Sequence, residues 1–189
     1  MSAMDNYQAL LNKTDAKAAE IVARYPDKIN CGRGCHTCCI RGLTVNGIER
    51  ASIKKYLETR PQLLLNVREN VKNDPHHGQR CSFLDEAGSC MIYEVRPIVC
   101  RSHGMPLKIK PELGSQEAKV AQNNSSSADE LDVCPLNFTD MALADVGSHY
   151  FISLETLNTI LVLLNQQFDL KNAEKRHLLT PDGVMLPTS

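Results

Sequence analysis

Four of the eight cysteines in this chain fall within nine residues, close enough for their sulfur atoms to share a metal ion. In chain order the cysteines are Cys31, Cys35, Cys38, Cys39, Cys81, Cys90, Cys100 and Cys134. Thiolate sulfur is a soft, charged ligand that suits zinc, iron and iron–sulfur clusters. Gly32 and Gly34 permit a tight backbone in the first group and expose amides that can hydrogen-bond to sulfur. We therefore expect the cysteines to bind a metal.

Structural disulfides and simple burial explain the first group less well than metal binding does. No oxidising compartment is indicated, and the adjacent Cys38 and Cys39 have poor geometry for a disulfide. Free cysteine often behaves as a small buried hydrophobe, which suits an isolated residue such as Cys134. The first group instead lies among glycines and polar residues, which are typical of a loop.

The number of metal sites stays open from the sequence. A fourth ligand for the first group has to come from further along the chain. Because adjacent side chains usually point in different directions, Cys38 and Cys39 either serve different sites or include only one ligand. Eight thiolates can build two four-sulfur sites, or one site with spare cysteines. We expect one centre built from both cysteine stretches. The favoured ligands are Cys35, Cys38, Cys39, Cys81, Cys90 and Cys100, followed by Cys31 and Cys134.

The kind of metal stays open too. Structural zinc usually binds cysteine pairs two to four residues apart, and only the first group supplies that spacing. Cys31, Cys35 and Cys38 have the spacing Cys-x3-Cys-x2-Cys. Radical-SAM enzymes hold a [4Fe–4S] cluster with cysteines at this spacing. The chain is short for their barrel and has no alternating strand–helix pattern, which excludes that enzyme class. The candidate cofactors are zinc or iron, with a [4Fe–4S] cluster as one form of the iron.

Charged side chains flank the cysteines. A site made of thiolates carries net negative charge, and Arg96 and Arg101 are expected to offset it by hydrogen bonds to sulfur or to loop carbonyls. We therefore assign these two arginines to cofactor binding. His36 and His103 lie beside cysteines, but an isolated histidine is more often structural than a ligand.

The cysteine spacing resembles that of the CxxCxxCC (YkgJ-like) family of zinc- or iron-chelating proteins. The first group resembles the opening of that family, with three residues in the first gap where the family name has two. CSFLD at 81–85, CMIYEVRP at 90–97 and CR at 100–101 are similar to the family's later signatures. The resemblance spans about residues 31–103, and Cys134 fits as a late family cysteine. It implies a bacterial cysteine-cluster protein that binds zinc or iron.

The same broad family includes the flagellin lysine methylase, for which an iron–sulfur cluster and S-adenosylmethionine are implicated. This chain has no glycine-rich loop on a strand that would cradle S-adenosylmethionine. An enzymatic role therefore rests on analogy alone. Three function classes follow: a protein that chelates zinc or iron, an iron–sulfur enzyme such as a protein lysine methyltransferase, and a thiol redox switch.

Amphipathic helices are predicted on both sides of the cysteine stretches. Apolar residues at helical spacing predict a helix over 5–25, with a capping box formed by Asp5 and Gln8. Asn46 with Glu49 predicts a second helix start, and Pro61 a third. A short helical turn is expected from Pro97, and a strongly apolar helix over 153–168. These elements predict a mainly α fold, a small helical domain with irregular cysteine-rich loops around a metal centre.

The rest of the chain is expected to lie outside this helical frame. Residues 114–132 are polar and predict a mobile surface loop, and residues 181–189 predict a frayed tail. We expect a single domain over 1–189, with a metal-binding core at about 31–134.

The composition of the chain argues against some classes of binding partner. The chain has 189 residues, and its 21 basic and 22 acidic side chains give a net charge of -1, which offers no attraction to nucleic acid or anionic membranes. No apolar run approaches the ~18 residues of a membrane span, and a secretory signal is not expected. We expect a cytoplasmic protein whose partner is a metal ion or an iron–sulfur cluster; a protein partner is not indicated.

Overall fold

The computed structural model describes residues 1–39, 43–73, 80–110 and 129–171. Within them lie five α-helices, four short 3-10 turns and a three-stranded sheet, so the fold is mainly helical, as predicted. The helices are α1 (Ala3–Arg24), α2 (Gly47–Glu58), α3 (Pro61–Lys72), α4 (Ile98–Ser102) and α5 (Leu154–Lys171). The turns are η1 (Pro26–Lys28), η2 (Tyr93–Val95), η4 (Leu143–Asp145) and η5 (Ser148–Tyr150), and the strands are β1 (Leu107–Ile109), β2 (Glu130–Asp132) and β3 (Ile152–Ser153).

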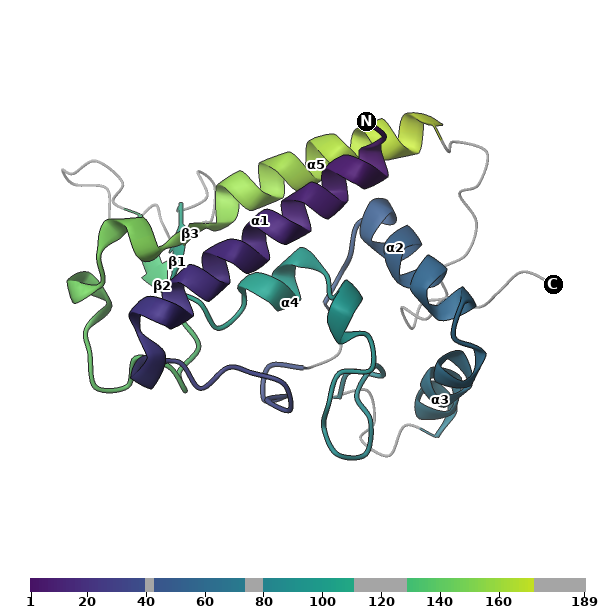
Figure 1. Ribbon diagram of the computed structural model, residues 1–189, viewed down its shortest axis with the longest axis horizontal. Coiled ribbons are helices and arrows are strands. Elements are labelled where there is room, and N and C mark those ends of the chain that lie inside the picture. The colour runs from purple at the N-terminus through teal and green to yellow at the C-terminus, as the bar shows by residue number, and fades with distance from the viewer. Residues whose placement is uncertain (40–42, 74–79, 111–128, 172–189) are drawn as a thin grey trace, which may run out of the picture.

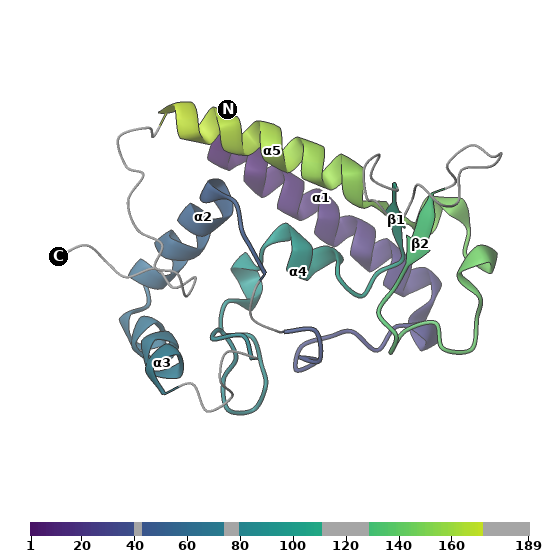
Figure 2. The ribbon, with the colours of Figure 1, turned by 180° about the vertical axis from the view of Figure 1, so that it is seen from behind.

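The helices α1 and α5 run antiparallel along one side of the molecule (Figure 1). The short α4 packs beneath α1, and α2 and α3 form one end while the sheet forms the other (Figures 1 and 2). The main hydrophobic core lies where α1, α4 and α5 meet the sheet. Its buried members include Tyr7, Leu11, Ile21, Ile98 and Leu161.

The first helix starts earlier than predicted. Ser2 is its N-cap: the Ser2 hydroxyl accepts from the amide of Asp5 at 3.1 Å, and the Ser2 amide donates to the Asp5 carboxylate at 2.7 Å. The predicted capping box of Asp5 and Gln8 is therefore wrong. Asp5 occupies the third helical position, because Ser2 offers a better-placed oxygen at the start of the same apolar pattern.

The other helix starts are confirmed. Asn46 and Glu49 form the capping box of α2, and Pro61 occupies the first turn of α3. Pro97 precedes α4, and the Ser153 hydroxyl accepts from the Thr156 amide at the start of α5. Caps and first-turn prolines act within one helical turn, which is why short-range patterns locate them correctly.

The sheet was not predicted. Its strand order is β2-β1-β3, with β1 antiparallel to β2 and parallel to β3. The expectation of a polar loop over 114–132 is wrong for 130–132, which form β2; residues 111–128 and the expected tail at 181–189 lie outside the described residues. Strands of two or three residues are too short to show an alternating pattern, and their pairing joins distant parts of the chain.

A second hydrophobic cluster lies away from the α1–α5 pair. It joins α2, α3 and η2 through buried Ile53, Leu57, Val67 and Ile92. The two clusters matter for the site because Cys31 packs against the main core and Cys90 packs against this second cluster. Between them, the segment 29–39 and the loop 80–92 lie side by side below α4 (Figures 1 and 2).

None of the helices within the described residues is long and apolar enough to cross a membrane.

Candidate metal centre

All eight cysteines lie in described parts of the chain and carry thiols rather than disulfides. Seven are half-buried, and Cys134 is buried with 8% of its surface exposed. Four are in the segment after η1, two in the loop before η2, one in α4 and one just after β2. The fold therefore gathers cysteines from four separate segments of the chain.

The first cysteine group lies on two consecutive tight turns. The amide of Cys35 donates to the carbonyl of Gly32 at 3.1 Å, and the amide of Cys39 donates to the carbonyl of His36 at 2.9 Å. Gly34 between them has φ +93°, a conformation that side-chain-bearing residues rarely adopt. The turns therefore curl the backbone of the first cysteine group tightly, as its glycines predicted.

The second cysteine stretch contains a tight turn at 85–88. The Gly88 amide donates to the Asp85 carbonyl at 3.1 Å, and the Ser89 amide donates to the Asp85 carboxylate at 2.7 Å. A β-bridge then pairs Leu84 with Cys90. This small hairpin fixes the position of Cys90 relative to Cys81 at its base.

The two cysteine stretches contact each other directly. The Cys81 amide donates to the Cys39 carbonyl at 3.0 Å. The ring of His36 lies against Gly88, where an added Cβ would come within 2.5 Å of the histidine Nδ1, and that nitrogen lies 3.0 Å from the Gly34 carbonyl. The His36 ring, although exposed, thus contacts both loops.

Asn137 links the last cysteine to the first, and sequence reasoning missed it. Its amide group donates to Cys31 Sγ at 3.3 Å and to the Gly104 carbonyl at 2.6 Å, and its Oδ1 accepts from the Asn30 amide at 2.8 Å. Its backbone amide donates to the Cys134 carbonyl at 2.9 Å. One buried side chain therefore joins three segments that are distant in sequence, and only its position three residues after Cys134 could have signalled it.

Burial raises the pKa of the thiols on the Cys31 side. The pKa of Cys31 rises to about 11, first because of burial and then because Cys134, Cys35 and Cys38 lie near it, while the Asn137 hydrogen bond acts in the opposite direction. The pKa of Cys38 is raised by burial and then by Cys35. Without a metal, these sulfurs hold their protons at neutral pH.

Cys39 and Cys100, which are influenced by Cys81 and Cys90, show the same effect. Burial raises the pKa of Cys39 to about 12, with further contributions from Cys38, Cys81, Cys100 and Cys90. Burial also raises the pKa of Cys100 to about 12, and the neighbouring Cys81 and Cys90 add to the shift. A metal ion that binds here has to displace these protons.

Across the described residues, no three Cys, His, Asp or Glu side chains converge closely enough to hold a metal ion. The thiols are gathered but do not form a closed coordination sphere. The donor set itself fits zinc or iron, because every gathered ligand is a sulfur and tight turns supply amides beside them. A metal site here would require the thiols to move closer together.

One buried hydroxyl lacks a hydrogen-bond acceptor, and a charged sulfur would supply one. The hydroxyl of Tyr7, whose side chain is 1% exposed, has no hydrogen-bond partner among the described residues. Burial raises the pKa of Tyr7, and the charges of Glu49, Arg101 and Cys100 act on it. A metal-bound thiolate at Cys100, whose charge acts on Tyr7, would suit this donor as an acceptor.

The two arginines assigned to the site from the sequence have different surroundings. Arg101 is 7% exposed, forms an ion pair with Asp15 on α1, and donates to the carbonyls of Glu94 and Arg96. Arg96 lies over the ring of Tyr93, with 3.6 Å between its guanidinium carbon and the ring centroid. Arg101 thus holds the segment before α4 against α1.

The charge of Arg96 acts on two cysteines of the second stretch and α4. It opposes the burial that raises the pKa of Cys90, and it does the same for Cys100. Of the two predicted cofactor-binding arginines, Arg96 is therefore the one placed to offset the charge of bound thiolates. Arg80, the third arginine beside a cysteine, donates to the Asp85 carbonyl at 3.2 Å and supports the hairpin.

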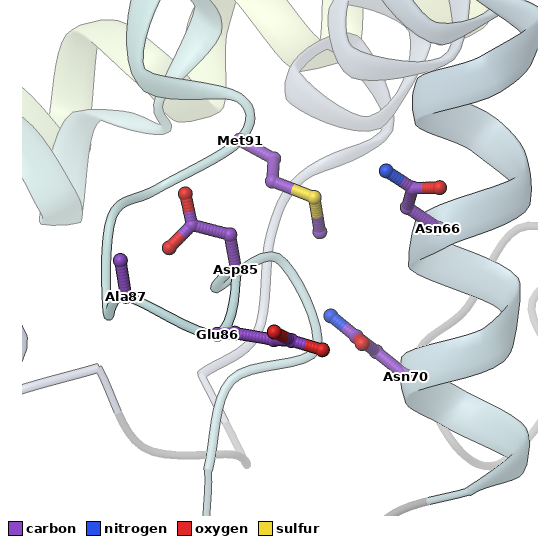
Figure 3. A pocket seen from close by; sticks show the side chains of 6 residues that line it. All are labelled: Asn66, Asn70, Asp85, Glu86, Ala87 and Met91. Carbon is purple, nitrogen blue, oxygen red and sulfur yellow. The ribbon is translucent and has the colours of Figure 1, made fainter.

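A pocket of about 440 Å³ opens beside the second cysteine stretch. Asn66 and Asn70 on α3 face the loop that carries Asp85, Glu86 and Met91 across it (Figure 3). No cysteine lines this pocket, although Met91 follows Cys90 directly. The pocket is thus separate from the gathered thiols but next to them.

Gly104 provides a test of how the Cys31 side is packed. It has φ +99°, and a Cβ there would overlap Cys31 Sγ. We expect Gly104→Ala to lower the free energy of unfolding by about 2 kcal/mol, from backbone strain, and to expose Cys31 to alkylation. Gly32→Ala is the matched control, because no atom lies within 4 Å of its added Cβ, and it should change stability by less than about 0.5 kcal/mol. Denaturant unfolding of both variants checks this, and equal effects would contradict it.

Comparison with known proteins agrees with this arrangement of cysteines. A family model described as "Putative zinc- or iron-chelating domain" matches residues 30–130, which is more than half of the chain and includes seven of the eight cysteines. Neither the curated proteins nor the solved structures give a match. The two linked cysteine stretches and the extent of the match together show that this chain belongs to the CxxCxxCC family.

Proposed function

We propose that this protein binds zinc or iron through its clustered cysteine thiolates. The observation that carries the proposal is the hydrogen bond from the Cys81 amide to the Cys39 carbonyl, at 3.0 Å, which places the two cysteine stretches side by side. Membership of a family described as zinc- or iron-chelating supports the same chemistry.

All eight cysteines are candidate ligands in this proposal. Bound metal would neutralise thiolate charge, and Arg96 would offset part of what remains at Cys90 and Cys100. A [4Fe–4S] cluster is included among the forms of iron, because four thiolates are its usual ligands. A reducing compartment such as the bacterial cytoplasm, where we place the protein, keeps these thiols available.

A second candidate function is catalysis on a lysine side chain at an iron–sulfur centre. The observation that favours it is the pocket of about 440 Å³ beside Met91 (Figure 3), because Asp85 and Glu86 provide carboxylates for an ammonium group. Cluster-loaded protein, S-adenosylmethionine and a lysine-containing peptide would test it, with methylated peptide as the expected product. A thiol redox switch has less support, since it needs cysteines of low pKa and burial raises the pKa of Cys31, Cys39 and Cys100.

The first experiment is elemental analysis of protein purified without oxygen, together with its visible absorption spectrum. Stoichiometric zinc without colour would support chelation, and iron with acid-labile sulfide and a brown chromophore would support a cluster. The control is protein whose metal is removed and whose cysteines are then alkylated before zinc or iron is added back. This protein should take up no metal. Reduced protein that takes up neither zinc nor iron, or that contains paired cysteines instead, would overturn the proposal.

A further inference from the structure

We propose that the eight cysteines form two neighbouring four-cysteine metal sites rather than one site with spare cysteines. This inference rests on the proposed function and assigns each thiol to a site. Site A is Cys31, Cys35, Cys38 and Cys134, and site B is Cys39, Cys81, Cys90 and Cys100.

Site A is held together by Asn137. The Asn137 side chain donates to Cys31 Sγ at 3.3 Å, and its backbone amide donates to the Cys134 carbonyl at 2.9 Å. Cys31 and Cys134 are therefore anchored by the same residue, although 103 positions separate them in the sequence. The turn that ends at Cys35 follows directly after Cys31, so Cys35 stays on this side.

Site B is assembled by the other loop and by α4. The Cys81 amide donates to the Cys39 carbonyl at 3.0 Å, and the bridge between Leu84 and Cys90 folds the hairpin back toward its base. Cys90 packs against the second hydrophobic cluster, whereas Cys31 packs against the main core. The two sets of thiols thus adjoin different parts of the fold.

The adjacent Cys38 and Cys39 divide between the sites. Successive side chains usually point in different directions, and the surroundings of these two thiols differ. After burial, the pKa of Cys38 is raised by Cys35 and then by Cys134, whereas the pKa of Cys39 is raised by Cys38 and by the other three thiols of site B. Cys38 also acts on Cys100, after Cys81 and Cys90, so the two sites adjoin there. Each site then has four sulfurs, the number that zinc and [4Fe–4S] clusters both take.

The sites also differ in the group that balances their charge. Arg96 acts on Cys90 and Cys100 of site B, whereas the polar neighbour of site A is the neutral amide of Asn137. Because a full cation balances thiolate charge better than an amide does, site B should bind metal more tightly than site A. The two sites should therefore fill one after the other.

The test is zinc titration of the reduced, metal-free, full-length protein, followed by brief alkylation and intact-mass measurement. The expected species carry eight, four and no labels, with the four-label species most abundant near one equivalent of zinc. Peptide mapping of that species should find the labels on the cysteines of site A. A four-label product that persists at excess zinc means one site with spare cysteines, and species with only eight or no labels mean one shared cluster; either result overturns the inference. Protein that keeps eight labels at every zinc concentration contradicts metal binding itself.

Two matched variants give an independent readout. Cys35→Ser should remove the metal of site A and Cys90→Ser that of site B, so each should keep half of the wild-type metal content. The double variant should keep none. If both single variants lose all of the metal although circular dichroism shows them folded, one shared centre is present and the inference is wrong. If either variant fails to fold, the alkylation pattern of the unmodified protein still decides between one site and two.

Discussion

Removing the metal should loosen the cysteine loops of this protein while the α1–α5 pair stays folded. The α1–α5 interface is built from buried apolar residues such as Leu11, Ile21 and Leu161, which need no metal. The segment 31–39 and the loop 80–92 depend instead on a few backbone hydrogen bonds and half-buried thiols. A ligand that binds only the folded state stabilises it by about 4 kcal/mol at a thousand times its dissociation constant.

Hydrogen exchange with and without a chelator measures this effect. When metal present at a thousand times its dissociation constant is removed, the free energy that protects the amides of 31–39 and 80–92 from exchange should fall by about 4 kcal/mol. The protection of amides in α1 and α5 should change far less. Restoring zinc or iron should restore the protection, and alkylated protein, which cannot bind metal, is the control. If the loops and the α1–α5 pair lose protection together, metal binding is coupled to the whole fold; if neither changes, the loops hold no metal.

The helices of this fold could be predicted from the sequence because their signals are local. Asn46 with Glu49 and the prolines at 61 and 97 each act within one turn, and the structure has helix starts at all three. The start of α1 was misassigned because Ser2 and Asp5 are both good capping residues and periodicity alone does not choose between them. The sheet escaped prediction because its strands are short and joined only by distant pairing.

The candidate site could be predicted only in part for the same reason. Spacing and motifs identify the cysteines and the contact between their two stretches, since the ligands of a cysteine site have to converge. The role of Asn137 depends on β2 returning the chain to Cys31, a tertiary event with no local pattern. Glu49 gives a second example. The sequence shows its capping box with Asn46, but it does not show the hydrogen bond that its carboxylate accepts from Ile98 in α4.

Glu49→Ala should be among the most damaging single substitutions outside the cysteines. The carboxylate is 3% exposed and accepts two backbone hydrogen bonds, from the amides of Asn46 and Ile98, both at 2.9 Å. It thus caps α2 and also holds the first turn of α4, the helix that carries Cys100. Hydrogen bonds to charged groups contribute about 1.5–3 kcal/mol each, so we expect the free energy of unfolding to fall by about 3 kcal/mol or more.

The same substitution should also weaken metal binding, because α4 loses the contact that fixes its position relative to the loops. Glu49→Gln keeps the side-chain shape but turns one acceptor into a donor facing an amide, so its effect should be intermediate. Glu58→Ala is the matched control in the same helix: its carboxylate is exposed and lies 3.7 Å from Lys54, an ion pair worth at most about 0.5 kcal/mol. Urea unfolding and zinc affinity, measured on all three variants, check both effects. If Glu49→Ala behaved like Glu58→Ala, α4 would be held by its apolar contacts alone, and the buried carboxylate would not couple the helical frame to the cysteines.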